Sequence, residues 1–494
     1  MNWKARLNKN LLDFTSFRTW RQNQKTIIST MPNCVEILKE KFSRSLGIPW
    51  QGILSSSTIE EVLLSSTISE AELSSQIKKR RNRFFNPIVT LWAFLYQVID
   101  EDKSCSNAVS KIVAWLAESN MKTPSSNTGG YTKAKQRLSE NFLKNLFQKT
   151  GDNLESKAQS EDLWCGRHVK MMDGSSVLMP DTSANQSCYP QHSNQSPGCG
   201  FPIAKLVVMF SLVTGAAMGV LMEAFNTSEI FMARQMYYLL LPQDVALADR
   251  AFGTYVDLAL VKQRLADAVF RCHHSRKNDF KRGKRLSKND YLVTWYKPKT
   301  RPRHMSAVEF NCLPDSQVVR QVRFQVPQSG FRTKEIIVVT TLLDNKIYTL
   351  QKIAQLYRWR WQVEIDIRHV KTTLKMEMLR GKTPNMVRKE VLVYLMAYNL
   401  LRAIMWDAAE TNNVSKRLIS LQTSRQYLKS FITALLNAGK RKSQILYKTM
   451  LDKIVQKLLP ERNDRTEPRV IKRRKKSYPL MTKPRNATKP QIAA

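Results

Sequence analysis

Four residues whose side chains suit phosphate and metal chemistry recur within one short stretch of the chain. Tyr357, Arg360, Glu364 and Lys371 are spaced as Y-x2-R-x3-E-x6-K. At about 100° per residue, a helix would bring their side chains within about 60° of one another on one face. A carboxylate between two cations and a tyrosine hydroxyl is suited to holding a metal ion beside a phosphate.

The same stretch carries an apolar stripe about 80° further round the predicted helix. Its members are Val363, Ile367, Val370 and Leu374. The two stripes together predict a helix over residues 350–375 that buries one face and presents the charged face.

Two aspartates follow segments that have the apolar character of buried strands. Asp173 follows residues 168–172, and Asp249 follows residues 245–248. Ligands bind at the carboxyl ends of strands in open α/β sheets, so we expect both aspartates to meet Glu364 at one edge. Three carboxylates at one place repel each other unless cations bind there. Their oxygen atoms favour Mg²⁺, with Mn²⁺ as a substitute, and two such ions can clamp the oxygens of a phosphoryl transfer.

The segments around the two aspartates predict the scaffold that positions them. Three strands, a helix, a strand, a helix and a strand follow in this order. The expected bounds are 168–172, 206–212 and 218–224 for the strands, 228–241 for the helix, 245–248 for the next strand, and a last helix and strand that end near 272. This is the order of the ribonuclease H-like fold, an α/β fold in which helices flank a mixed sheet.

A segment of different composition interrupts this order of strands and helices between Asp249 and Glu364. Residues 275–333 begin with a basic segment and continue with short β-like runs at 292–296 and 317–326. An apolar strand over 335–343 then resumes the first pattern. We therefore expect a β-rich insert between the second aspartate and the glutamate.

At this point the sequence resembles a known family. Asp173-Gly174-Ser175, the block from Asp249 to Gly253, and the Tyr357/Arg360/Glu364/Lys371 spacing look like the three motif blocks of DDE transposases of the insertion sequence 4 type. The third block matches that family's Y-R-E-K spacing at every position, and the resemblance covers about residues 165–410.

The resemblance implies a catalytic domain that cleaves and joins DNA at transposon ends. It implies that Asp173, Asp249 and Glu364 are the catalytic metal ligands. Tyr357, Arg360 and Lys371 would then hold backbone phosphates of DNA near the cut. Because transposition holds two DNA ends together, a homodimer in the DNA complex is expected.

Two further residues are candidates for contacts with DNA. Arg250 follows Asp249 and either steers DNA or braces the aspartate. Trp295 lies in the insert near Lys297 and Lys299, where a ring among cations can stack on an unpaired base. The alternative is a strand tryptophan that packs in the insert's own small core.

The flanking regions are expected to be mainly helical. Residues 1–160 are predicted to form a helical DNA-binding domain, 161–412 the catalytic domain, and 413–460 C-terminal helices. Residues 461–494 are predicted to be a basic, disordered tail. A helix over 131–147 is expected to turn Lys133, Lys135 and Arg137 outward, either toward DNA or simply toward solvent.

Composition narrows the class of partner. The chain has 494 residues and a net charge of +39, which favours a polyanion such as double-stranded DNA. An anionic membrane is the competing partner, but the chain has no lipidation signal and no long basic amphipathic helix. Seven cysteines without a C-x2-C pair argue against a disulfide framework or a structural zinc site. With no apolar signal segment, a cytoplasmic, nucleoid-associated location is expected.

Two other functions stay open from the sequence. A DNA-binding remnant of a transposon without catalysis would share the charge and the helices, but the intact Asp173, Asp249 and Glu364 favour an enzyme. A nuclease of the same fold that cuts without joining would not need the β-rich insert and the Tyr/Arg/Lys stripe.

Overall fold

The computed structural model describes most of the chain from residue 84 onward. The described residues are 84–118, 123–273, 280, 283–325, 335–460, 481–484 and 487. The predictions for residues 1–83, for much of the basic start of the insert and for most of the C-terminal tail lie outside these residues.

The described residues contain a nine-stranded mixed sheet in the order β3-β2-β1-β4-β5-β9-β8-β7-β6. Its strands are β1 (Val169–Leu178), β2 (Ile203–Ser211), β3 (Ala217–Ala224), β4 (Val245–Ala248), β5 (Asp267–Arg271), β6 (Lys284–Ser287), β7 (Asp290–Tyr296), β8 (Ser316–Gln325) and β9 (Glu335–Thr340). The predicted α/β class with a mixed sheet is confirmed.

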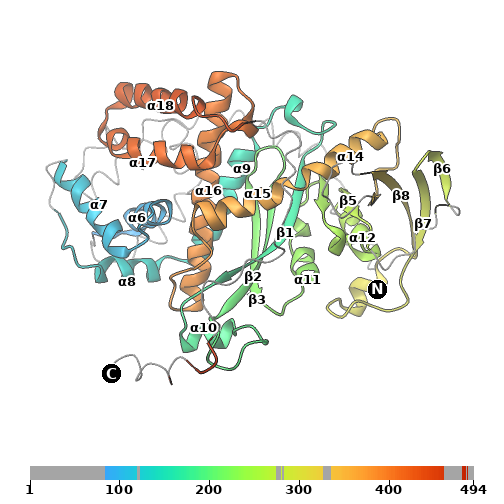
Figure 1. The fold of residues 1–494 in the computed structure, drawn as a ribbon, viewed down its shortest axis with the longest axis horizontal. Coiled ribbons are helices and arrows are strands. Elements are labelled where there is room, and N and C mark those ends of the chain that lie inside the picture. Colours follow the sequence, from blue (N-terminus) through green and yellow to red (C-terminus); the bar gives the residue numbers. More distant parts are fainter. Residues whose placement is uncertain are drawn as a thin grey trace, which may run out of the picture.

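Strand directions divide this sheet into two parts. Strands β1, β4 and β5 are parallel, and β2 and β3 extend the sheet from β1 in antiparallel fashion. Strand β9 pairs antiparallel with β5 and connects it to the antiparallel β8, β7 and β6. The β-rich insert therefore prolongs the central sheet rather than forming a separate one, and it lies at one end of the molecule (Figure 1).

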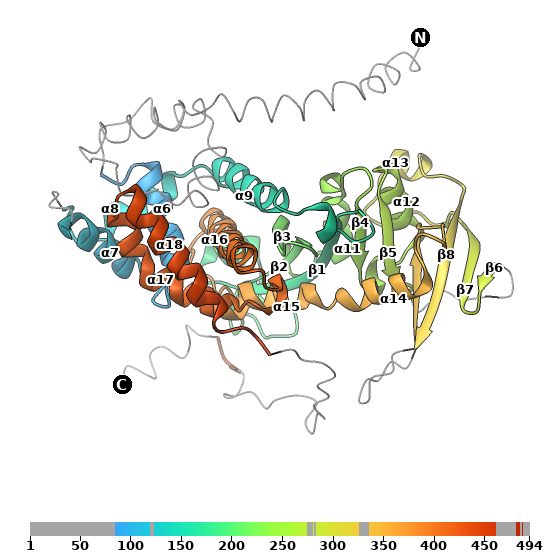
Figure 2. The same ribbon diagram turned by 90° about the horizontal axis from the view of Figure 1, so that it is seen from above.

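Helices cover both faces of the sheet. Helices α14 (Leu350–Trp359) and α15 (Gln362–Arg368) run along one face. Helices α11 (Glu229–Arg234) and α12 (Tyr255–Gln263) lie on the other (Figure 2). The predicted helix over 228–241 is shorter than expected, because the chain leaves α11 and forms a short 3-10 turn at Tyr237–Leu239. Two short helices, α10 (Ser183–Cys188) and α13 (Ala307–Asn311), lie in connecting segments.

The predicted signature helix is divided into three consecutive pieces. These are α14 (Leu350–Trp359), α15 (Gln362–Arg368) and a π-helical turn over His369–Thr373. The apolar stripe behaves as predicted, because Val363, Val370 and Leu374 are buried. Turns of π-helix inside α-helices occur often at functional sites.

The N-terminal helices contribute to two hydrophobic clusters, one of which includes the sheet. They are α6 (Pro87–Ile99), α7 (Cys105–Glu118), α8 (Gly129–Arg137) and α9 (Glu140–Glu155). Buried side chains of α6 and α9 belong to one hydrophobic cluster with the sheet and α16. The packing therefore crosses residue 160, and the predicted domain division there stays a prediction.

Two details of the N-terminal prediction are wrong. The expected helix over 131–147 is broken where Ser139 caps a new helix with its side chain. Lys135 is buried instead of turned outward. Its ammonium group donates to Gln97 Oε1 at 3.1 Å and lies over the rings of Phe94 and Tyr131, which together replace the water that a buried charge loses.

A long central helix, α16 (Pro384–Asn412), joins the helices to the sheet. Thr383 caps its start and Pro384 occupies its first turn, a common helix beginning. By length and composition this helix could cross a membrane, but 89% of its most apolar window is buried inside the molecule, as in the core helix of a folded domain. Helices α17 (Leu421–Asn437) and α18 (Lys440–Val455) pack against it.

Candidate active site

Asp173 lies inside a strand rather than at its end, which corrects the sequence prediction. Strand β1 continues to Leu178 because β2 pairs with it from Lys170 to Leu178. The parallel partner β4, however, pairs only with Val169–Met171. Asp173 thus stands just beyond the point where the parallel part of the sheet stops.

The register of β1 and β4 directs the two aspartates toward the same edge of the sheet. Met171 pairs with Leu247, so continuing the ladder by two residues brings Asp173 opposite Asp249 on the same face of the sheet. On the far side of β4, Ala248 pairs with Phe270, and the next position brings Asp249 beside Arg271. The register is therefore compatible with the predicted meeting of Asp173 and Asp249 at one edge, which stays a prediction.

Glu364 approaches this edge from the helix that covers it. Helix α15 packs against β1, and Glu364 is one-third exposed. Arg360 donates from Nη2 to Glu364 Oε1 at 2.9 Å. Burial alone would lower the pKa of Arg360, but Tyr357, Glu364 and Asp249 raise it. The guanidinium therefore lies among the carboxylates that the sequence singled out.

Burial and nearby charges shift the pKa of the Asp173 carboxyl group. Burial raises the pKa of Asp173 to about 6; the backbone N–H of Gly174 and the charge of Arg360 oppose that rise, and Glu364 and Glu229 add to it. Asp173 therefore shares its local field with Glu364 and with Arg360.

Glu229 is a neighbour that the sequence analysis missed. A Cβ on Gly174 would lie 2.5 Å from the carboxyl carbon of Glu229, so the absence of a side chain at Gly174 admits this carboxylate. Adjacent residues of a strand point to opposite faces, which places Glu229 behind β1 relative to Asp173. Arg271 was missed as well; its position at the end of a strand parallel to β4 was the available signal.

The carboxylates do not form a closed metal cage in this arrangement. Among the described residues, no three Asp, Glu, His or Cys side chains are grouped closely enough to hold a metal ion. The donor set of Asp173, Asp249 and Glu364 nevertheless suits a hard cation, since it offers oxygen atoms only. The guanidinium group of Arg360 forms an ion pair with Glu364.

The remaining members of the predicted stripe differ in exposure. Tyr357 is buried, and burial raises its pKa well above the ordinary value. Its ring lies 6.3 Å from that of Phe324, which favours a core-packing role for the ring, although Arg360 and Asp249 are close enough to act on its hydroxyl. Lys371 is half-buried in the π-helical turn.

Arg250 and Trp295, the two residues outside the stripe that were predicted to contact DNA, differ in their exposure. Arg250 is exposed in a 3-10 turn directly after Asp249. Trp295 is only 3% exposed and belongs to the main hydrophobic cluster. Because strand residues alternate between faces, the adjacent Tyr296 is the exposed ring, at 72%. This burial favours packing over base stacking for Trp295, although it packs in the main core rather than in a separate core of the insert, and the stacking role stays a prediction.

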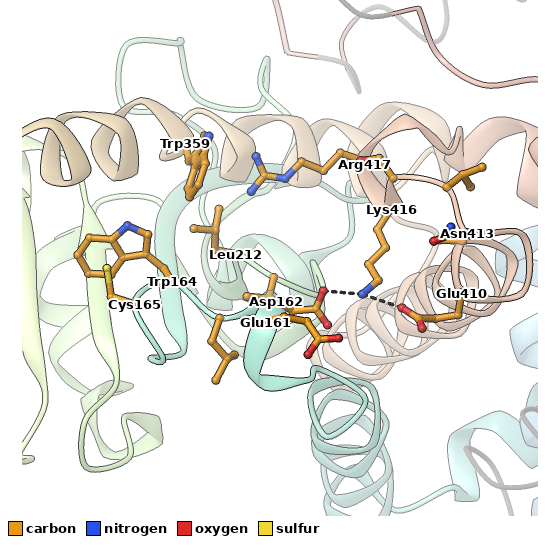
Figure 3. A pocket seen from close by; sticks show the side chains of 15 residues that line it. Glu161, Asp162, Trp164, Cys165, Leu212, Trp359, Glu410, Asn413, Lys416 and Arg417 are labelled. Carbon is orange, nitrogen blue, oxygen red and sulfur yellow. Dashed lines mark hydrogen bonds and ion pairs between the residues drawn. The ribbon is translucent and has the colours of Figure 1, made fainter.

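A separate hollow of about 610 Å³ lies near the start of β1. Trp164, Trp359 and Arg417 line it, and Lys416 bridges Asp162 at 2.6 Å and Glu410 at 2.7 Å (Figure 3). None of the predicted site residues lines this hollow. Lys416 pairs with two of the three carboxylates that line the hollow. Because its lining includes no predicted site residue, the hollow is separate from the site at Asp173.

Comparison with known proteins shows the class of protein to which this arrangement of residues belongs. Residues 164–400 match the family model of the transposase DDE domain. The matched segment contains Asp173, Asp249 and Glu364 with the strands and helices that carry them. The chain is a DDE transposase.

Its relatives identify the kind of element. The transposase InsG of the insertion sequence element IS4 from Escherichia coli (strain K12) is 25% identical over 359 residues, which span 71% of this chain and 77% of that protein. This chain is a transposase of an insertion element. A transposase of the insertion sequence element IS421 from Escherichia coli is 29% identical over 70 residues, 14% of this chain and 19% of that protein.

A solved structure shows a weaker similarity. The piggyBac transposase in a synaptic complex with hairpin DNA aligns with a TM-score of 0.39 and 9% identity, over 83% of this chain and 85% of that chain. A likeness of this strength supports no argument about the present site.

Proposed function

We propose that this protein binds the terminal inverted repeats of its insertion element, cleaves DNA at the element ends and joins those ends to target DNA. Asp173, Asp249 and Glu364 are the catalytic carboxylates of this proposal. The observation that supports it is the register of β1 and β4, whose extension by two residues would set Asp173 beside Asp249. Helix α15, which carries Glu364, packs against β1.

Divalent cations fit the donor set of this site. Asp173, Asp249 and Glu364 would hold Mg²⁺, or Mn²⁺ in its place, with Glu364 exchanging its bond to Arg360 for a bond to the metal. When bound, two such ions would polarise the scissile phosphate and activate the attacking hydroxyl or water. The raised pKa of Asp173 supports this assignment, because its burial and its carboxylate neighbours leave excess negative charge that a cation would relieve.

The cations of the signature helix then act on the DNA backbone. Arg360, once released from Glu364, would present a planar fork that matches a phosphate, and Lys371 would add a point charge about three turns further along the chain. Arg250 is exposed beside Asp249 and would guide the strand toward the carboxylates. Tyr357 would contribute through its hydroxyl only, since its ring is buried.

The catalytic core is proposed to be ribonuclease H-like. The order β3-β2-β1-β4-β5, with β1, β4 and β5 parallel and β2 antiparallel, supports this assignment. The β-rich insert and the N-terminal helices would hold the DNA on either side of the carboxylates. A homodimer on two DNA ends, acting at the nucleoid in the cytoplasm, completes the proposal.

Two alternatives make different predictions. A silent DNA-binding remnant would bind ends but not cut them, and the close approach of Asp173, Arg360 and Glu364 argues against it. A nuclease of the same fold would cut without joining. The insert that prolongs the sheet beyond β5 favours the transposase, since cut ends must be retained and aimed again.

The test is a strand-resolved cleavage and joining assay. It uses purified protein, duplex DNA with the terminal sequences of the protein's own element, and Mg²⁺, beside the Asp173→Ala variant. Nicking and joining that require the metal and vanish in the variant would support the transposase. End binding without cleavage by either protein would favour the silent remnant, and cleavage without joining would favour the nuclease.

A further inference from the structure

A buried acid lies directly behind the proposed catalytic glutamate. Asp366 follows Glu364 by two residues on α15 and is fully buried. Its Oδ1 accepts a hydrogen bond from the Tyr398 hydroxyl at 3.0 Å and lies 4.0 Å from Arg402 Nη1. Both partners belong to α16, so this carboxylate connects the signature helix to the central helix.

The partners of Asp366 are in turn fixed to the sheet. The ring of Tyr398 packs edge-on against Phe210 with their centroids 5.8 Å apart. Phe210 pairs with Met171 in the β1–β2 ladder, and Met171 precedes Asp173 by two residues on the same face. A short chain of contacts therefore runs from Asp366 to the strand that carries Asp173.

The second partner reaches the turn between β2 and β3. Arg402 donates from Nε to the carbonyl oxygen of Thr214 at 3.1 Å. Gly215 has a φ of +70°, and any Cβ there would overlap the Arg402 guanidinium. The turn thus leaves room for this arginine, which links α15 to a second point of the sheet.

The polar contacts complement apolar packing that has little directionality. Val363, Val370 and Leu374 bury the inner face of the helix, but apolar side chains restrict rotation and sliding less sharply than a hydrogen bond does. Buried charged groups contribute little net stability compared with apolar residues of similar volume, and one attested role for them is to fix register. Among the described residues, Asp366 Oδ2 and the Nδ1 of His369 on the next turn are buried without a hydrogen-bond partner, so the polar groups of this region are not all satisfied.

We propose that Asp366 is a positioning residue that sets the rotation of α15, through Tyr398 and Arg402, so that Glu364 faces Asp173. This inference rests on the proposed function of Glu364 as a metal ligand. Asp366 itself touches neither metal nor DNA. Its loss would turn or loosen the helix and separate the carboxylates while the fold persists.

The chain offers a matched control for this inference. Asp257 on α12 is also fully buried and also has an arginine and a tyrosine as partners. It accepts hydrogen bonds from Arg234 Nε at 2.8 Å and from the Tyr237 hydroxyl at 3.2 Å. Helix α12 lies on the opposite face of the sheet from α15 (Figure 2), so its variants report stability without moving Glu364.

The experiment compares Asp366→Asn and Tyr398→Phe with Asp257→Asn and Tyr237→Phe. Tyr398→Phe keeps the ring and removes only the hydroxyl, so it stands in if Asp366→Asn fails to fold. Thermal melts measure the stability of each variant, and binding to terminal DNA in EDTA measures the fold of the DNA-binding surface. Single-turnover nicking is then recorded across a Mn²⁺ series, and hydrogen exchange of residues 357–373 is measured in metal-free protein.

The expected result separates positioning from stability. Asp366→Asn should bind ends within about twofold of the unaltered protein, need about tenfold more Mn²⁺ for half-maximal nicking, and nick about tenfold to 100-fold more slowly at saturation. Exchange at 357–373 should rise in both α15 variants and in neither control. Equal effects in the Asp257 and Asp366 variants, or an unchanged metal requirement and unchanged exchange in Asp366→Asn, would overturn the inference.

Failure of the proposed function would look different. If the unaltered protein binds ends but never nicks, the proposed function fails. The hydrogen-exchange comparison still decides whether Asp366 holds the helix, because it needs neither metal nor cleavage.

Discussion

Arg360 Nη2 lies 2.9 Å from Glu364 Oε1, one helical turn away, and the same guanidinium acts electrostatically on Asp249 and Asp173. Arg360 is therefore paired directly with Glu364 and lies near enough to both aspartates for its charge to act on them. In the proposed function, metal binding to the carboxylates would free Arg360 for the DNA backbone.

Replacing Glu364 by glutamine should separate catalysis from binding. The amide keeps the shape of the side chain but removes its charge, so nicking should fall at least about 100-fold, the scale expected when one preorganised charged group is lost. Binding to terminal DNA should stay within about twofold in a gel-shift assay. Glu377→Gln, an exposed glutamate beyond the π-helical turn, is the control and should retain nicking. A Glu364→Gln variant that cleaves normally but no longer binds would remove Glu364 from the metal site.

Replacing Lys371 by alanine should change the salt dependence of binding. A lysine that contacts one phosphate releases about one counterion, so the slope of log Kd against log salt should decrease in magnitude by about 0.9. The affinity loss should accordingly be largest at low salt. Titrations between low and moderate NaCl measure this, with Lys352→Ala, an exposed lysine on α14, as the control. An unchanged slope would exclude a phosphate contact by Lys371.

Replacing Gly215 by alanine should destabilise the protein more than a positive φ alone explains. Gly166 has a φ of +73° with no atom near its absent Cβ, whereas Gly215 has a φ of +70° and faces the Arg402 guanidinium. Gly166→Ala should lower the free energy of unfolding by about 1 kcal/mol. Gly215→Ala should lower it by about 1–3 kcal/mol more, because the arginine must move. Urea unfolding measures both, and equal losses would mean that Arg402 relaxes freely.

The buried Lys103 should make stability depend on pH in the alkaline range. Burial, with help from the charges of Arg425 and Lys375, lowers its pKa from 10.5 to about 7. Between these values the unfolded chain binds a proton that the folded chain does not, so stability should rise as the pH increases from about 7 to 10. Below about 7 the full penalty of burying the charge is present. Urea unfolding of the unaltered protein and Lys103→Met at pH 6–10 should show this rise only in the former, and parallel curves would contradict it.

The aromatic pair of the insert should divide into a packing residue and an exposed residue. Trp295→Ala removes a buried ring and should lower the free energy of unfolding by about 3–5 kcal/mol. Tyr296→Ala removes an exposed ring and should change it by less than about 0.5 kcal/mol. Thermal melts of both variants test this. If Trp295→Ala melts like the unaltered protein but stalls after the first nick, the stacking role returns to Trp295.

Several features of this protein follow from local sequence alone. The buried stripe of Val363, Val370 and Leu374 was predictable because helical periodicity depends only on residue spacing. Strand β4 and the aspartate after it were predictable because a short apolar run followed by turn-forming residues has few other solutions. The Y-R-E-K spacing is likewise local, and it carried the resemblance to the family.

Other features depend on partners that are distant in the sequence. Asp173 sits within β1 because β2 pairs with both sides of it, and the burial of Lys135 depends on Gln97. Trp295 is buried and Tyr296 is exposed because only one face of β7 meets the core.

The sequence by itself therefore determined the class of chemistry, since the identity and spacing of the charged residues are written in it. The tertiary structure decided which charged side chains lie close enough to interact. Strands β1, β4 and β5 become neighbours through parallel pairing, and Asp366 is linked to α16 only because Tyr398 and Arg402 reach it from that helix. Long-range pairing sets these distances, and no local pattern encodes them.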